Sequence, residues 1–344
     1  MSRGHPFVLL LLARLREFLR EPEVVFWVFF FPVLLAVGLG VAFRNKPPDE
    51  VVVGVVSGPG AEEILGVLRS HEGFRAEVMP AREAHDRLRL GKISIAVVPG
   101  RVYEYRYDPT RPDSVLARQE VHDALQRAAG RTDPVEVMET QVTEPGARYI
   151  DFLIPGLLGM NIMSGGMWGV GFVIVEMRSR KLLKRLIATP MRRRDFLGAM
   201  MASRMILVFS EMLLLLVFGW LVFSMVIRGS LVTIFFLSIL GAFVFAGLGL
   251  LVASRARKIE TVSGLMNLVM LPMLVFSGIF FSADRFPAAI QPFVKALPLT
   301  ALNDSLRAVI LEGADFPSQA LRILVMLIWG ALSFVLALRL FRWT

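Results

Sequence analysis

The sequence contains no cysteine, so disulfide bonds, thiol nucleophiles and cysteine-ligated metal sites are excluded. It also has no phosphate-binding loop of the form G-x-x-x-x-G-K-[ST], because Gly91 and Lys92 are followed by Ile93 and lack the upstream glycine. The four histidines are too scattered to predict a metal site. We therefore expect no catalytic residue, no metal and no cofactor on this chain, and no ATP bound through such a loop.

Charged residues are also scarce, at 19% of the sequence against 55% hydrophobic residues. This balance lies outside the range of soluble globular proteins and indicates a membrane protein. A run of about 20 apolar residues is long enough to cross the hydrocarbon core of a bilayer. Such runs occur at 24–43, 152–175, 204–227, 231–253, 261–282 and 319–341. We predict a polytopic α-helical membrane protein with six transmembrane helices.

The positive charge is gathered in the segments that share one side if all six runs cross the membrane. These segments are the arm 1–23, the loop 176–203, the turn 255–260 and the C-terminal tail. The positive-inside rule places them in the cytoplasm. We therefore predict a multi-pass protein of the cell membrane, the inner or plasma membrane of a bacterium, with both termini cytoplasmic. Residues 44–149 and 283–318 are then outside.

The segment 44–149 differs from the rest of the chain, because short β-patterned runs alternate with amphipathic helical patterns. About a hundred residues are enough for a small domain of this kind. We predict an extracytoplasmic α/β domain inserted between the first two transmembrane helices. Strands are predicted at 51–56, 74–79, 93–98, 102–107 and 134–142, and helices at 61–70, 81–92 and 113–130.

The arm 1–23 predicts an amphipathic helix that lies in the cytoplasmic membrane interface and ends before Pro22. Its polar side carries Arg16, Glu17 and Arg20. Its apolar side consists of Val8, Leu11, Leu12, Leu15, Phe18 and Leu19. This helix either only anchors the chain or also docks a cytoplasmic partner.

Small residues are frequent in the second and fourth apolar runs, which indicates close helix packing. The second run contains the pair Gly165 and Gly169. One face of the fourth run carries Ser238, Ala242, Ala246, Gly249 and Ala253. These small-residue faces have two interpretations. They serve helix packing inside the bundle, or one of them slides or opens around a substrate path. Both interpretations stay open.

Five motifs follow one another in the second half of the chain: "YIDFLIPGLLG", "VEMRSRKLLKRLIATPMRRRDFLGAMMASR", "RGS" before the fourth apolar run, "LPMLVFSGIFFSADRFP" and "LPLTALNDSLRAVILEG". In their order and spacing, from about residue 149 to the end, the chain resembles the permease subunit of type-2 ABC exporters. The insertion at 44–149 and the N-terminal helix are similar to the subgroup with a large extracytoplasmic domain.

This resemblance implies a membrane subunit that acts with a separate cytoplasmic ABC ATPase, which binds ATP and magnesium, and with a second permease, identical or related. It also implies short helices at about 283–318 that dip back into the outer leaflet. A coupling helix at about 180–187 would enter a groove on the ATPase. The residues assigned to this coupling are Leu182, Leu183, Lys184, Arg185, Leu186, Ile187, Thr189 and Pro190.

The residues of this loop predict two separate roles. The cations at the helix ends, Arg178, Arg180, Lys181 and 192–194, are expected to bind anionic lipid and fix the topology. The leucines and the isoleucine of 182–187 form an apolar stripe that lipid or a protein groove could bury. Because interleaved aromatic residues are absent, we expect no nucleic-acid partner.

Glu211 is an ionisable residue in the third apolar run, where facing lipid would cost about 2.5 to 3.5 kcal/mol. It either pairs with Arg204 or reaches the cytoplasmic face, or it lines the transport pathway in a polar site with Asn161 or Asn267. We expect an exporter subunit rather than an enzyme, with a lipid, drug, polysaccharide or ion as substrate. The alternative is a membrane sensor that relays a signal from the extracytoplasmic domain.

Overall fold

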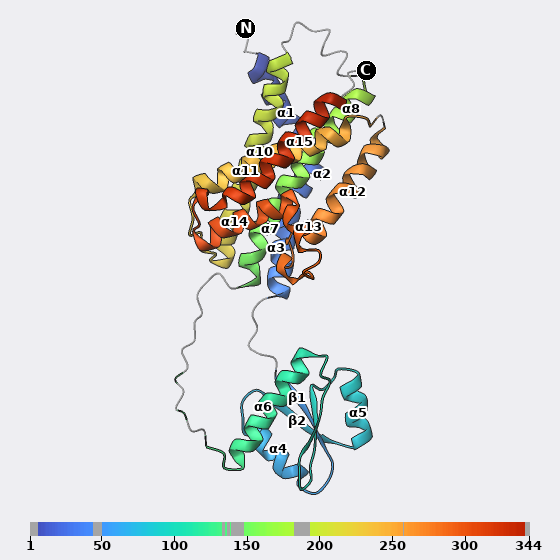
Figure 1. Ribbon diagram of the computed structural model, residues 1–344, viewed down its shortest axis with the longest axis vertical. Helices are drawn as coiled ribbons and strands as arrows, with labels where there is room; N and C mark the ends of the chain where they lie inside the picture. Colours follow the sequence, from blue (N-terminus) through green and yellow to red (C-terminus); the bar gives the residue numbers. More distant parts are fainter. Residues whose placement is uncertain are drawn as a thin grey trace. The chain divides into compact units, whose positions relative to one another are not determined.

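The computed structural model describes residues 6–43, 50–132, 135, 138, 148–181, 193–256 and 258–340. The chain divides into two compact units, which are drawn in Figure 1. The smaller unit comprises Lys46–Val142, and the larger unit comprises the chain on both sides of it.

The described part of the larger unit contains six helical segments that are long and apolar enough to cross a membrane. This confirms the predicted polytopic helical fold. Two of the segments include a turn of π-helix, at η1 and at η2. In chain order the segments are α2 (Pro22–Val25), η1 (Phe26–Phe30) and α3 (Phe31–Ala42); α7 (Tyr149–Gly166), η2 (Met167–Phe172) and α8 (Val173–Ser179); α10 (Arg193–Phe223); α11 (Leu231–Ala253); α12 (Ile259–Phe276); and η4 (Phe316–Gln319) with α15 (Ala320–Leu340).

Two of these helices end earlier than the apolar runs predict. The third was expected to reach residue 227, but α10 stops at Phe223 because Ser224 has a φ of 51°. The fifth was expected to reach residue 282, but α12 stops at Phe276, shortly before Gly278 with a φ of 67°. A left-handed residue interrupts a helix without changing the hydropathy of the sequence, so the runs could not reveal either end.

α11 lies at the centre of the larger unit and packs against α7, η2, α14 and α15. In Figure 1, α11 and α15 run side by side. The closest approach involves glycines: Gly171 lies against the carbonyl oxygen of Gly249, and Gly249 lies against the backbone of Gly166 and Met167. Here the small residues bring two backbones together, which is the packing interpretation of the small-residue faces.

Gly249→Ala is expected to destabilise the larger unit by about 1–3 kcal/mol, as overpacking does. The new Cβ would lie 2.8 Å from the carbonyl oxygen of Met167 and 2.9 Å from its Cα, and backbone cannot yield like a flexible side chain. Thermal unfolding in detergent measures the effect. Gly264→Ala is the matched control, since nothing lies within 4 Å of its Cβ position; an equal loss for both variants would contradict the packing argument.

The N-terminal helix is α1 (Pro6–Arg20), which packs along α10. The ring of Phe18 meets that of Phe29, with centroids 6.0 Å apart. Val8, Leu12 and Leu19 remain exposed apolar residues. Because α1 already buries one side against the bundle, this exposed apolar side is the part available to lipid, and its place in the interface remains a prediction.

Short helices follow α12: η3 (Ala283–Arg285), α13 (Gln291–Ala296) and α14 (Pro298–Glu312). α14 is buried against α7, α11 and α15. Its Asn303 donates to the carbonyl of Ser277 at 2.8 Å, and its Arg307 donates to the carbonyl of Gly278 and lies over the ring of Phe152. These bonds satisfy carbonyl groups that the end of α12 leaves without helical partners.

The smaller unit is an α/β domain, as predicted, with a four-stranded sheet in the order β2-β1-β3-β4. β1 (Val51–Val56), β2 (Phe74–Met79) and β3 (Ile95–Val98) are parallel, and β4 (Glu104–Arg106) is antiparallel to β3. One face packs against α4 (Ala61–Arg69) and α6 (Pro112–Ala128), and the other against α5 (Ala81–Arg89). The predicted strand 134–142 lies almost wholly outside the described residues.

Candidate coupling and transport site

The eight residues assigned to ATPase coupling, from Leu182 to Pro190, lie outside the described residues. The structure describes the segment that leads into them. There α8 ends with Arg180 paired to Glu176 at 2.9 Å, and Lys181 turns the chain with a φ of 56°. The basic loop therefore leaves α8 at a sharp and defined point.

Arg178, which was predicted to bind anionic lipid, makes hydrogen bonds within the bundle, and its role toward lipid stays a prediction. Its Nη1 donates to the carbonyl oxygens of Ala253, at 3.1 Å, and Ala256, at 2.9 Å. These carbonyls belong to the last residue of α11 and to the turn that follows it. The last carbonyls of a helix lack intrahelical donors and carry partial negative charge, so they attract a cation.

Glu211 forms a buried ion pair with Arg204 of the same helix. Nη1 of Arg204 lies 3.2 Å from Oε1 of Glu211, and the two residues are 9% and 1% exposed. Because the membrane-crossing part of α10 runs from Gly198 to Phe223, Glu211 lies near its middle rather than near one end. It therefore depends on Arg204, since the middle of the span is too far from water for the carboxylate to reach it.

Arg204 extends toward α7, where Gly165 makes room for it. A Cβ at Gly165 would collide with the guanidinium, so this glycine of the predicted small-residue pair accommodates a cation. Nε and Nη2 of Arg204 and Oε2 of Glu211 are buried without a hydrogen-bond partner among the described residues. Buried polar atoms of this kind are usually satisfied by water or by another group.

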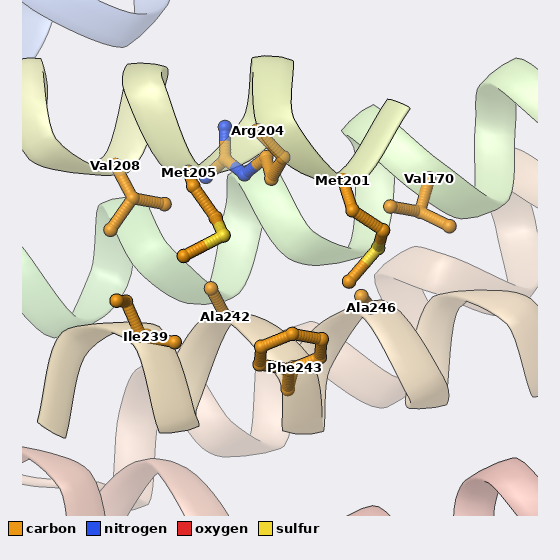
Figure 2. A pocket seen from close by; sticks show the side chains of 9 residues that line it. All are labelled: Val170, Met201, Arg204, Met205, Val208, Ile239, Ala242, Phe243 and Ala246. Atoms are coloured by element: carbon orange, nitrogen blue, oxygen red, sulfur yellow. The ribbon is translucent and has the colours of Figure 1, made fainter. Parts of the chain in front are cut away.

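A small cavity lies beside Arg204, between η2, α10 and α11 (Figure 2). Its volume of about 10 Å³ is close to the space that one water molecule needs. In this conformation the cavity is therefore too small for a drug-sized or lipid-sized substrate. Apart from Arg204, its lining is apolar: Val170, Met201, Met205, Val208, Ile239, Ala242, Phe243 and Ala246.

The other two members of the predicted polar site have different surroundings from Glu211. Nδ2 of Asn161 donates to the carbonyl of Val28 at 3.1 Å, within the π-helical turn η1 of the first span. Asn267 is exposed on α12. No hydrogen bond of the described residues joins Glu211 to either asparagine. Glu211 thus belongs to an ion pair, Asn161 makes a hydrogen bond between two helices, and Asn267 carries an exposed amide.

The sequence analysis did not find the partners of Arg178, Gly165 or Asn161. Hydropathy and charge locate a polar residue along a helix, but not the neighbour it meets across the bundle. The signal that came closest was the small-residue pair at Gly165 and Gly169, which indicated a close neighbour without indicating that the neighbour was an arginine.

The six spans, the central glycine-packed helix and the basic loop after the second span together allow a comparison with known proteins. The sequence profile of the ABC-2 family transporter proteins matches residues 22–339. The chain belongs to this family. Its first span, the smaller unit and all but the end of the last span lie within the matched range.

Individual relatives of this ABC-2 family member share between 25% and 34% of the aligned residues with it. A protein of Escherichia coli K12 named "Probable multidrug ABC transporter permease YbhS" is 25% identical over 202 residues, covering 58% of this chain and 53% of the relative. ABC transporter G family member 20 of Dictyostelium discoideum is 25% identical over 210 residues, 60% of this chain and 29% of the relative. Nodulation protein J of Bradyrhizobium diazoefficiens is 34% identical over 100 residues, 29% of this chain and 37% of the relative.

The match therefore spans only about half the length of the Escherichia coli relative, and less of the other two. These comparisons establish the family and confirm the resemblance that the sequence motifs indicated. They also support a transport component as the class of the chain.

Proposed function

We propose that this ABC-2 family member is the membrane-spanning permease subunit of an ATP-driven exporter. The observation that carries the proposal is the family match over residues 22–339 of a chain with six candidate spans. The sequence has no phosphate-binding loop, so ATP and magnesium are assigned to a separate cytoplasmic ABC ATPase. The chain itself binds no cofactor and catalyses no reaction in this proposal.

The substrate class remains a lipid, drug, polysaccharide or ion. The name of the Escherichia coli relative, which refers to multiple drugs, supports an amphiphilic or apolar substrate. The apolar lining around Arg204 is compatible with that choice, but the cavity would have to enlarge. Such an enlargement corresponds to the second interpretation of the small-residue faces, in which α7 and α11 open around a substrate.

A second permease subunit, identical or related, is part of the proposal. Asn267 is exposed on α12 beside the exposed leucines Leu268 and Leu271. An amide that faces hydrocarbon has no hydrogen-bond partner, whereas helix interfaces in membranes commonly include such residues. Burial of α12 against a second subunit would remove this cost. The mass of the purified particle, measured by light scattering with the detergent subtracted, distinguishes one copy from two.

The proposed location is the cell membrane of a bacterium, with both termini and the basic loop inside and the smaller unit outside. Because the chain has no cysteine, single introduced cysteines report their own accessibility. In intact cells, a membrane-impermeant maleimide is expected to label Glu62→Cys in the smaller unit and not Ser179→Cys, although both positions are exposed. Labelling of Ser179→Cys before permeabilisation would contradict the orientation.

The function is tested by purifying the tagged chain with its bound proteins and reconstituting the particle into vesicles. We expect an ATPase with a phosphate-binding loop in the particle, and hydrolysis that exceeds that of the ATPase alone. The alternative, a sensor, predicts a signalling protein at the basic loop instead. A particle that carries no ATPase and hydrolyses no ATP would overturn the exporter proposal.

A further inference from the structure

We propose that Arg178 is a positioning residue that ties the start of the coupling loop to the end of α11, so that the start of the loop and the α11–α12 turn move as one body. This inference rests on the proposed function, because it assigns a task to the loop that would bind the ATPase. Leu182, the first of the predicted coupling residues, follows Arg178 by four positions.

The first support is the pair of hydrogen bonds made by Arg178. A single nitrogen, Nη1, donates to the carbonyls of Ala253 and Ala256, which lie on both sides of the point where α11 ends. Both alanines are buried, at 0% and 3% exposure, which limits competition from water. Hydrogen bonds from a charged donor are stronger than neutral ones, so this contact fixes the turn to the end of α8.

The second support is the close packing between η2 and α11, in the residues that precede this contact in each span. Gly171 in η2 lies against the carbonyl of Gly249 in α11, and any Cβ at either position would meet backbone. The second span and α11 are therefore joined at two points: by backbone packing between Gly171 and Gly249, and by the hydrogen bonds of Arg178. Close-packed interiors have low compressibility and transmit strain, so a displacement of α8 should be passed to α11.

The third support is a contact between α8 and α1. Nη2 of Arg14 in α1 lies 3.7 Å from Sδ of Met177, the residue before Arg178. α8 also packs against α12. Met177 and Arg178, near the end of α8, thus contact α1 through one side chain and the α11–α12 turn through the other. This is a contiguous set of contacts of the kind through which coupling between sites can pass.

The experiment compares Arg178→Met, which keeps the apolar stem and removes the donors, with Arg178→Lys, which keeps the charge. Arg255→Met is the matched control, since it removes an exposed cation from the same turn. Each variant is purified with the ATPase that the unsubstituted chain retains and is reconstituted in phosphatidylethanolamine and phosphatidylglycerol vesicles. The readouts are the amount of ATPase bound and the stimulation of its hydrolysis by the permease.

We expect Arg178→Met to bind the ATPase normally but to retain only about a tenth of the stimulation. Arg178→Lys should retain at least about half, because an ammonium can still donate to helix carbonyls, and Arg255→Met should match the unsubstituted chain. Normal stimulation in Arg178→Met would overturn the inference while leaving the proposed function intact. If the unsubstituted chain retains no ATPase, the proposed function itself fails.

A second measurement does not depend on how well Arg178→Met folds. Spin labels at Ser179→Cys and Lys258→Cys, in the chain with Arg178 present, report the distance between the start of the loop and the turn. We expect the same narrow distance distribution in the nucleotide-free and the vanadate-trapped complex. A shift between the two states larger than the width of the distribution would show that the two points move independently, and would overturn the inference.

Discussion

Glu211→Leu is expected to destabilise the larger unit by about 3–5 kcal/mol, because it leaves the charge of Arg204 buried without its partner. Arg204 is only 9% exposed, and Nη1 donates to Glu211 while its other two nitrogens have no partner among the described residues. The loss is measured as a lowered midpoint of thermal or denaturant unfolding in detergent.

The double variant Arg204→Met, Glu211→Leu is expected to recover most of this stability. Replacing a buried ion pair by apolar residues of similar volume is often neutral or stabilising, whereas removing one partner is not. A double variant as unstable as Glu211→Leu alone would show that the loss came from leucine packing near the middle of α10, and not from the unpaired arginine. Comparing both single variants with the double variant gives the coupling energy of the pair directly.

Glu211→Gln separates stability from transport, because the amide keeps an oxygen that can accept from Arg204. We expect the subunit to assemble and the permease-stimulated hydrolysis to change, if the pair contributes to the pathway. If hydrolysis and export are both unchanged while Glu211→Leu is unstable, the pair only stabilises the bundle. The cavity of about 10 Å³ beside Arg204 is then a packing defect and not the closed form of a substrate site.

The spans could be predicted from the sequence because the thickness of a bilayer demands a long apolar run, and such runs are visible without a structure. The ends of the spans could not be predicted. Ser224 directly after α10, and Gly278 shortly after α12, adopt a left-handed backbone that the hydropathy of the sequence does not reveal. The sheet of the smaller unit was equally visible: in β1 and β3, alternate residues are divided between the two cores on either side of the sheet.

The polar contacts of the larger unit were the part that could not be predicted. Glu211 was identified as a residue that needs a partner, and Arg204 was named among the alternatives, because both lie on one helix and their spacing can be read along the chain. Asn161 was placed in the same site, yet it bonds to Val28 in the first span, more than a hundred positions away. A contact between helices depends on how they cross, which a single sequence does not record.

The double variant Leu183→Asp, Leu186→Asp is expected to release the ATPase from the purified particle. If the apolar stripe of 182–187 sits in a groove of the ATPase, two carboxylates there must give up their water without gaining a partner. Burying unpaired charges of this kind costs several kcal/mol, which corresponds to a loss of binding by a factor of about a thousand or more. Insertion into the membrane should continue, because no span and no cation that orients the chain has changed.

The matched control replaces the three arginines at 192–194 with glutamine, a change that weakens interaction with anionic lipid while leaving the stripe able to bind. Co-purification of the ATPase and the stimulation of its hydrolysis are measured for both variants in the same membranes. Only the aspartate variant should lose the ATPase, and only the glutamine variant should show altered orientation or lipid dependence. If the aspartate variant still binds and stimulates the ATPase, residues 182–187 are not the coupling helix. Arg178 would then tie α11 to a loop that faces some other partner, as the sensor alternative requires.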